Sequence, residues 1–221
     1  MNREVPLSTG EVYHVYNRGA HKQKVFTSPI DYARFQLLLY LGNAKDPVHM
    51  GNLLSKYKGP TFIKIYQEHD ISKEEKLVDI LAYSLLPNHF HLVLKQKVNG
   101  GISLFLKKVA TAYSMYFNGK YDHSGTLFQG RFKSSHVDTP EYLRWLFAYV
   151  YLNAADLCKE NALAKKTTFL RQYRYSSLPD ALDEGRPERS IVAIETLLTD
   201  FKEDHTADII ELTRIIKDRP L

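Results

Sequence analysis

Apolar residues recur with two periods along this chain, one typical of strands and the other typical of helices. Runs rich in β-branched and aromatic residues predict strands at 11–17, 79–86, 89–94 and 126–137. Apolar residues at helical spacing predict helices from Ser28 to about Gly42, over 102–117 and after Thr139. A serine or threonine followed by proline begins the first and third of these helices, which is a typical N-cap signal.

The order of these elements predicts an α+β fold, with a ferredoxin-like β-α-β-β-α-β core and an antiparallel sheet. In such a core both helices pack on one face of the sheet, and we expect the other face to be open to a ligand. The helix that begins after Thr139 follows the core. A polar segment at 43–77 is expected to be an insertion.

The length of 221 residues fits one domain with an appendage. We predict a domain at 1–179 and an acidic, helical C-terminal extension at 180–221, with helices at 190–201 and 206–217. Six basic and eleven acidic residues give the extension a net charge of −5. Because the whole chain has a net charge of +5, residues 1–179 have a net charge of +10. A basic body favours a polyanionic ligand, with nucleic acid first. A basic protein without such a ligand is the alternative.

Cys158 is the only cysteine, which excludes an internal disulfide and a cysteine-based zinc site. The longest apolar run, eight residues from Trp145, is much shorter than the roughly 20 residues that span a bilayer. The N-terminus has no apolar signal-peptide core. We therefore expect a cytoplasmic protein that does not associate with a membrane.

His89 and His91 flank Phe90 in a strand-like run. Side chains alternate between the faces of a strand, so the two imidazoles are predicted to lie side by side, opposite Phe90. Two such imidazoles can form half of a divalent-metal site. The alternative is a pair of histidines without a ligand on a half-buried sheet.

Tyr149 and Asn153 are four residues apart on the helix after Thr139, so their side chains can meet at the edge of its apolar stripe. A tyrosine can act as a covalent nucleophile, and a cation held by His89, His91 and Asn153 would assist it. The alternative is a tyrosine packed at a helix edge. Tyr151 points about 200° away on the helix, so we prefer Tyr149 as the nucleophile.

Aromatic residues alternate with Gln129, Arg131 and Lys133 in the predicted strand 126–137. Such alternation suits single-stranded nucleic acid, whose bases stack on rings and whose phosphates pair with cations. Arg18, together with lysines in the turn after the first strand, could add phosphate contacts. A solvated basic face is the alternative for both segments.

Four blocks of this sequence together resemble the single-tyrosine HUH transposases, which include the IS200-like transposases. The REP-associated tyrosine transposases of bacteria are the most similar branch. The blocks lie, in the family's order, at 13–19, 86–92, 127–134 and 149–153.

The resemblance implies cleavage and rejoining of single-stranded DNA, often beside a hairpin, with Mg²⁺ or Mn²⁺. His89 and His91 would be the metal ligands, and Asn153 would fill a third ligand position. Tyr149 would form a 5′-phosphotyrosine bond and release a 3′-hydroxyl. The family often has Asn-Pro after the tyrosine motif, whereas Ala154 and Ala155 follow Asn153 here.

The sequence is also compatible with two other functions. One is a domesticated transposase that binds hairpin DNA or RNA without catalysis, as a regulator. The other is a metal-dependent phosphoesterase that uses water, with Tyr149 only structural. The protein could be a monomer or a homodimer, and we favour a site completed within one chain.

Overall fold

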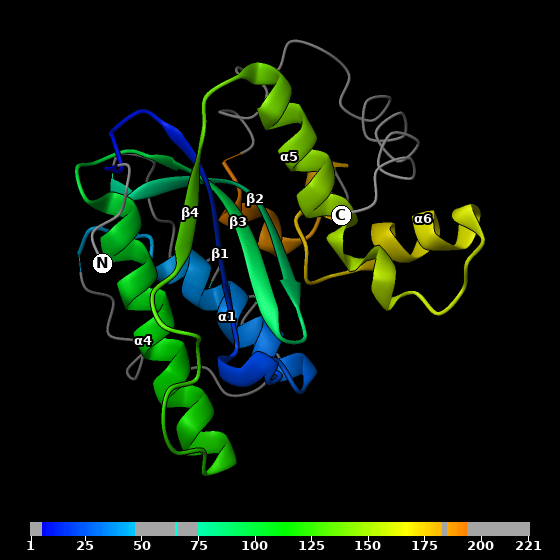
Figure 1. Ribbon diagram of the computed structural model, residues 1–221, viewed down its shortest axis with the longest axis horizontal. Helices are drawn as coiled ribbons and strands as arrows, with labels where there is room; N and C mark the ends of the chain where they lie inside the picture. The colour runs from blue at the N-terminus through cyan, green and yellow to red at the C-terminus, as the bar shows by residue number, and fades with distance from the viewer. Residues whose placement is uncertain (1–5, 47–64, 66–74, 183–184, 194–221) are drawn as a thin grey trace.

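The computed structural model describes residues 6–46, 65, 75–182 and 185–193. Its centre is a four-stranded antiparallel sheet with the strand order β2-β3-β1-β4 (Figure 1). The strands are β1 (Val12–Arg18), β2 (Val78–Leu86), β3 (His89–Gln96) and β4 (Lys133–Val137). The longer helices are α1 (Pro29–Leu41), α4 (Gly101–Tyr121), α5 (Pro140–Leu152) and α6 (Leu163–Gln172). This order of strands and helices confirms the predicted ferredoxin-like α+β fold.

The two faces of the sheet are packed against different helices. Phe90 is 2% exposed, and its ring lies 5.1 Å from that of Phe35 on α1. On the opposite face, the ring of His91 lies 5.2 Å from that of Tyr149 on α5. The expectation of an open second face is therefore wrong at His91, which is only 6% exposed. The apolar stripe of α5 covers this part of the sheet because Leu146, Phe147 and Val150 must be buried.

The fourth strand is shorter than predicted. β4 begins only at Lys133, whereas the prediction began at residue 126. Gly130 has a φ of +71°, which strand geometry does not allow, and Phe128 makes an isolated bridge with Gly19. Gln129 and Arg131 therefore lie on an irregular segment rather than on an alternating strand.

A buried carboxylate fixes the start of α1 against α4. Asp31 is 0% exposed, and it accepts hydrogen bonds from the backbone N–H of Ser28 at 2.8 Å and from the hydroxyl of Tyr116 at 2.8 Å. The ammonium of Lys120 lies 2.6 Å from the same carboxylate, and the Tyr121 hydroxyl donates at 2.8 Å. Lys120 and the hydrogen bonds hold the pKa of this carboxyl well below its usual range, although burial acts in the opposite direction.

We expect Asp31→Asn to lower the free energy of unfolding by about 3 kcal/mol, because it removes the buried charge and leaves Lys120 without its partner. Urea denaturation of the two proteins measures this difference. Asp122→Asn, an exposed change at the end of α4, is the control and should alter stability by less than about 0.5 kcal/mol. Equal stability of Asp31→Asn and the native protein would contradict the structural role of the cluster.

The chain after α5 packs along the β2 edge of the sheet. α6 projects from the side of the molecule (Figure 1), and Ser176 then makes a bridge with Ser84 on β2. A short helix, α7 (Leu178–Ala181), follows, and its buried Asp180 pairs with Arg186 at 2.7 Å. The helices predicted at 190–201 and 206–217 lie almost wholly outside the described residues.

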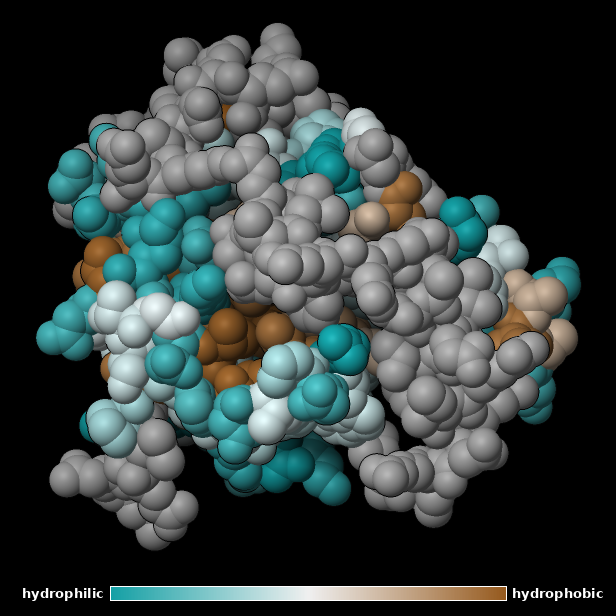
Figure 2. All heavy atoms as spheres, turned by 90° about the horizontal axis from the view of Figure 1, so that it is seen from above, coloured by the Kyte–Doolittle hydropathy of each residue, from teal (hydrophilic) through white to brown (hydrophobic). Residues whose placement is uncertain are grey.

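Hydrophilic residues cover much of the described surface seen from above, with apolar residues visible between them (Figure 2). Of the helices within the described ranges, none combines the length and the apolarity that crossing a membrane requires.

Candidate active site

His89 and His91 lie on one face of β3, as their spacing predicts, with ring centroids 5.1 Å apart. His89 begins the strand directly after the tight turn, and its Nδ1 lies 2.7 Å from the Oδ1 of Asn88. Because that carboxamide oxygen accepts a hydrogen bond, Nδ1 carries the proton and Nε2 of His89 keeps its lone pair for a metal.

A third histidine, His14 on β1, completes the cluster. Its Nε2 lies 2.9 Å from the Nδ1 of His91, and the two rings are stacked at 5.1 Å. The sequence pattern did not predict a role for this residue, because the contact depends on how β1 and β3 pair. In that register Tyr16 is opposite His91, which places His14 diagonally across from His91 on the same face.

Tyr149 projects from α5 onto these imidazoles. Its ring meets those of His91 and His14 edge-on, with centroids 5.2 Å and 5.9 Å away. The indole of Trp145, one helical turn earlier, stacks on Tyr149 at 5.3 Å. Tyr151 is 3% exposed and points into the core, in agreement with its predicted orientation. These side chains thus lie together within one chain.

Asn153 lies where α5 ends and a 3₁₀ turn, Asn153–Leu157, begins. Its carboxamide interacts with both the imidazole of His89 and the hydroxyl of Tyr149. Within the described residues, no group of three or more histidine, cysteine or acidic side chains is arranged to hold a metal. A metal site here would therefore use an amide oxygen beside the two imidazoles.

Burial shifts the pKa values of the cluster towards the neutral forms. It lowers the pKa of His14 to about 4, and it lowers the pKa of His91, with the neighbouring His14 and His89 adding to the effect. Burial also lowers the pKa of His89, whereas the Asn153 side chain partly opposes this shift. Burial raises the pKa of the Tyr149 phenol, which is therefore protonated at neutral pH unless a cation stabilises the phenolate.

We expect the metal-free protein to lose stability as the pH falls from about 6.5 to about 4. In this interval the unfolded chain protonates His14, whose ordinary pKa is 6.5, whereas the folded chain does not until about pH 4. The contribution of neutral His14 to the free energy of unfolding is thus fully present above the unfolded pKa of 6.5 and is lost as the pH falls to about 4. His14 alone accounts for a loss on the order of 3 kcal/mol over this interval. Thermal unfolding at pH 7 and pH 4.5 measures the change, and His14→Phe should show a smaller difference than the native protein.

A cavity of about 800 Å³ opens beside His89, Tyr149 and Asn153. Lys22 and Lys24 contribute to its wall from the segment after β1. Lys166 contributes from α6, a helix that sequence analysis did not predict. The cavity therefore brings positively charged groups from distant parts of the sequence close to Tyr149 and the imidazole of His89.

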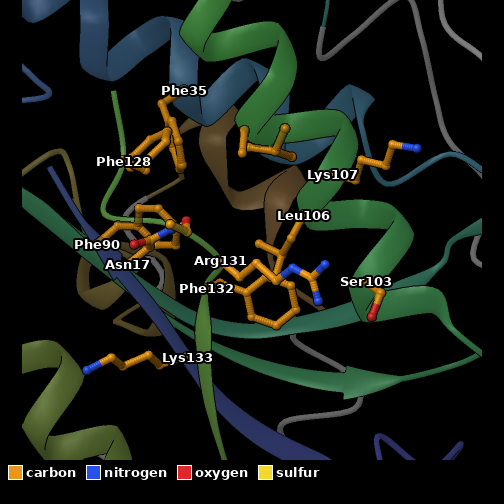
Figure 3. Close-up of a pocket in the computed structure, with 13 residues that line it drawn as sticks. Asn17, Phe35, Phe90, Ser103, Leu106, Lys107, Phe128, Arg131, Phe132 and Lys133 are labelled. Atoms are coloured by element: carbon orange, nitrogen blue, oxygen red, sulfur yellow. The ribbon is translucent and has the colours of Figure 1, made fainter. Parts of the chain in front are cut away.

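The predicted DNA-binding residues fall into two groups. Arg18 ends β1 opposite His89, and its guanidinium donates a hydrogen bond to the Gln129 side chain. Arg131 and Lys133 contribute to a second cavity, of about 830 Å³, beside α4. Figure 3 shows the Arg131 guanidinium near Phe132, whereas Lys133 extends away from the labelled phenylalanine rings. Lys133 pairs with Tyr16 in the sheet.

The segment that carries the candidate metal ligands and Tyr149 is similar to a known protein family. Residues 54–153 match the family "Transposase IS200 like". This segment contains His89, His91, Tyr149 and Asn153. The resemblance to the IS200-like transposases is confirmed. A role in DNA transposition or DNA binding is the class of function that this match supports.

Two further comparisons add less. No curated protein matches the sequence. A solved structure described as "Structure of the REP associates tyrosine transposase bound to a REP hairpin" is 12% identical, with a TM-score of 0.47. The similarity covers 84% of this chain and 87% of that chain.

Proposed function

We propose that this IS200-like protein cleaves and rejoins single-stranded DNA through a covalent bond to Tyr149, with a divalent metal. The single observation that carries the proposal is the position of Tyr149, whose ring lies 5.2 Å from that of His91 within the same chain. The family match covers all four residues of this site and supports DNA as the substrate. DNA that forms a hairpin is the form of substrate we favour.

The side chains present suit a divalent metal. Both Nδ1 atoms of His89 and His91 are engaged by neighbouring side chains, so each imidazole would bind the metal through its Nε2 atom. Asn153 would supply an amide oxygen, and the small number of protein ligands suits Mg²⁺ or Mn²⁺, which retain water or bind phosphate oxygens. Such an ion would polarise a phosphodiester oxygen and stabilise the negative charge that develops there.

Tyr149 would attack the phosphorus in line with the leaving 3′-oxygen. The Oη–P bond forms and the P–O3′ bond breaks, the phenol loses its proton, and the released 3′-oxygen gains one. Since the phosphotyrosine conserves the energy of the broken bond, another 3′-hydroxyl can reverse the step and join the strands. Trp145 and the two histidine rings restrict where the Tyr149 ring can lie, which positions Oη before substrate arrives.

The lysines of the 800 Å³ cavity are proposed to bind phosphates of the strand that reaches Tyr149. We expect the triple variant Lys22→Gln, Lys24→Gln, Lys166→Gln to bind single-stranded DNA more weakly, with the slope of log affinity against log salt reduced by about 2. Fluorescence anisotropy at several salt concentrations measures this slope. Lys165→Gln, next to Lys166 but outside the cavity wall, is the control and should change affinity little. An unchanged slope in the triple variant would contradict the proposed strand path.

A direct test uses labelled hairpin DNA with a single-stranded flank, incubated with Mn²⁺ and separated under denaturing conditions. The proposal predicts a protein–DNA adduct that forms only with the metal. Cleavage without an adduct would favour the phosphoesterase that uses water. Binding without cleavage would favour the non-catalytic regulator. Size-exclusion chromatography with light scattering would determine whether the active species is a monomer or a homodimer.

A further inference from the structure

His14 is a buried polar residue that is neither a proposed metal ligand nor the proposed nucleophile. Its side chain is only 9% exposed, because it lies within β1 on the face that α5 covers. It does not belong to the two-histidine pattern, and the family-matched segment begins only at residue 54. Its Nε2, however, is 2.9 Å from the Nδ1 of His91, a distance at which one nitrogen must donate a proton and the other must accept it.

We propose that His14 is the positioning residue of the metal site: it accepts a hydrogen bond from Nδ1–H of His91 and so holds the Nε2 of His91 unprotonated for the metal. This inference rests on the proposed function, because it assigns a task at the same site. A neutral imidazole carries its proton on only one nitrogen, so a fixed donor at Nδ1 leaves a lone pair at Nε2. Partners that orient a ligating histidine in this way commonly change metal affinity by about 10- to 100-fold.

The surroundings of His14 hold its ring in the required orientation. The ring is stacked on His91 at 5.1 Å with an angle of 19° between the planes, and Tyr16 stacks beside both imidazoles. Tyr149 meets the edge of the same group. His89 has the equivalent arrangement through Asn88, so each of the two proposed histidine ligands would have a partner at Nδ1. The two partners come from different places, since Asn88 is the residue before His89 and His14 is on the neighbouring strand.

The first test needs neither metal nor DNA. Long-range ¹H–¹⁵N correlation spectra of the metal-free protein, with specifically labelled histidine, report which ring nitrogen of each imidazole carries the proton. We expect the proton of His91 on Nδ1 in the native protein and in His14→Gln, whose amide oxygen can replace the acceptor. In His14→Phe, which keeps a planar ring but has no acceptor, the proton should be distributed over both nitrogens of His91.

The second test measures Mn²⁺ affinity without substrate. Trp145 is the only tryptophan of the chain and stacks on Tyr149, so quenching of its fluorescence by Mn²⁺ reports binding at this site. We expect His14→Phe to bind Mn²⁺ about 10- to 100-fold more weakly, and His14→Gln to remain within about threefold of the native protein. His136→Phe is the matched control, because this histidine lies on β4 and pairs with Glu11 at 2.8 Å. Its Mn²⁺ affinity should be unchanged.

The outcomes separate this inference from the proposed function. Absence of Mn²⁺ binding to the native protein would overturn the proposed metal site itself. Native binding together with equal binding by His14→Phe would overturn only the task given to His14. A proton on Nε2 of His91 in the native, metal-free protein would do the same, and it decides the matter even if His14→Phe fails to fold. Loss of affinity in His14→Gln as large as in His14→Phe would also contradict the hydrogen-bonding role.

Discussion

Tyr149→Phe is expected to abolish the covalent adduct and to slow cleavage of single-stranded DNA by at least about a thousandfold, because the variant has no nucleophilic oxygen. The phenyl ring keeps its stacking on Trp145 and its edge contact with His91, so the fold and the affinity for DNA should change little. Single-turnover cleavage with excess protein, followed on denaturing gels, measures the rate. Fluorescence anisotropy with the same DNA measures binding.

Tyr151→Phe provides the comparison for this experiment. Tyr151 lies two residues further along α5 and is the other candidate hydroxyl of this segment, but it is buried in the core on a different side of the helix. Its variant should cleave at close to the native rate. A loss of the adduct in Tyr151→Phe, with the adduct retained in Tyr149→Phe, would show that we have assigned the wrong tyrosine.

Removal of the metal is expected to have an effect of similar size. EDTA, or the double variant His89→Ala, His91→Ala, should reduce cleavage by at least about a thousandfold. Burial raises the pKa of the Tyr149 phenol, so without a cation the nucleophile is protonated and the phosphodiester is not polarised. Added Mn²⁺ should restore the EDTA-treated protein but not the double variant. The same cleavage assay measures both.

His136→Ala is a suitable control for the histidine variants, since it removes an imidazole from β4 that interacts with Glu11 rather than with the site. It should cleave normally. If the native protein cleaved DNA in EDTA as fast as it does with the metal, the metal-dependent mechanism would be contradicted. Groups other than a metal would then have to stabilise the Tyr149 phenolate.

The sequence was sufficient to predict the fold because local signals and topology agree. Alternation around Phe90 predicts the two faces of β3, and the N-cap signals at Ser28 and Thr139 predict where α1 and α5 begin. These signals depend on residues close together in the chain. The helical spacing of Tyr149 and Asn153 likewise predicts that their side chains meet, and both interact with the histidine cluster.

The remaining features depend on contacts between distant segments. His14 meets His91 only because β1 pairs with β3 in a particular register, and Lys166 reaches the cavity only because α6 returns beside Asn153. The irregular segment before β4 was missed because its composition is strand-like, whereas Gly130 adopts a positive φ and Phe128 is drawn into the core. Tertiary packing thus overrides a local preference for strand.

The most direct test of the central claim is mass spectrometry of the native protein after reaction with hairpin DNA and Mn²⁺. The adduct would be denatured and digested with nuclease and protease, and the modified peptide would be sequenced. The mechanism predicts a nucleotide linked through its 5′-phosphate to Tyr149, absent when EDTA is present during the reaction. Efficient cleavage with an unmodified Tyr149, or with the phosphate on another residue, would contradict the mechanism.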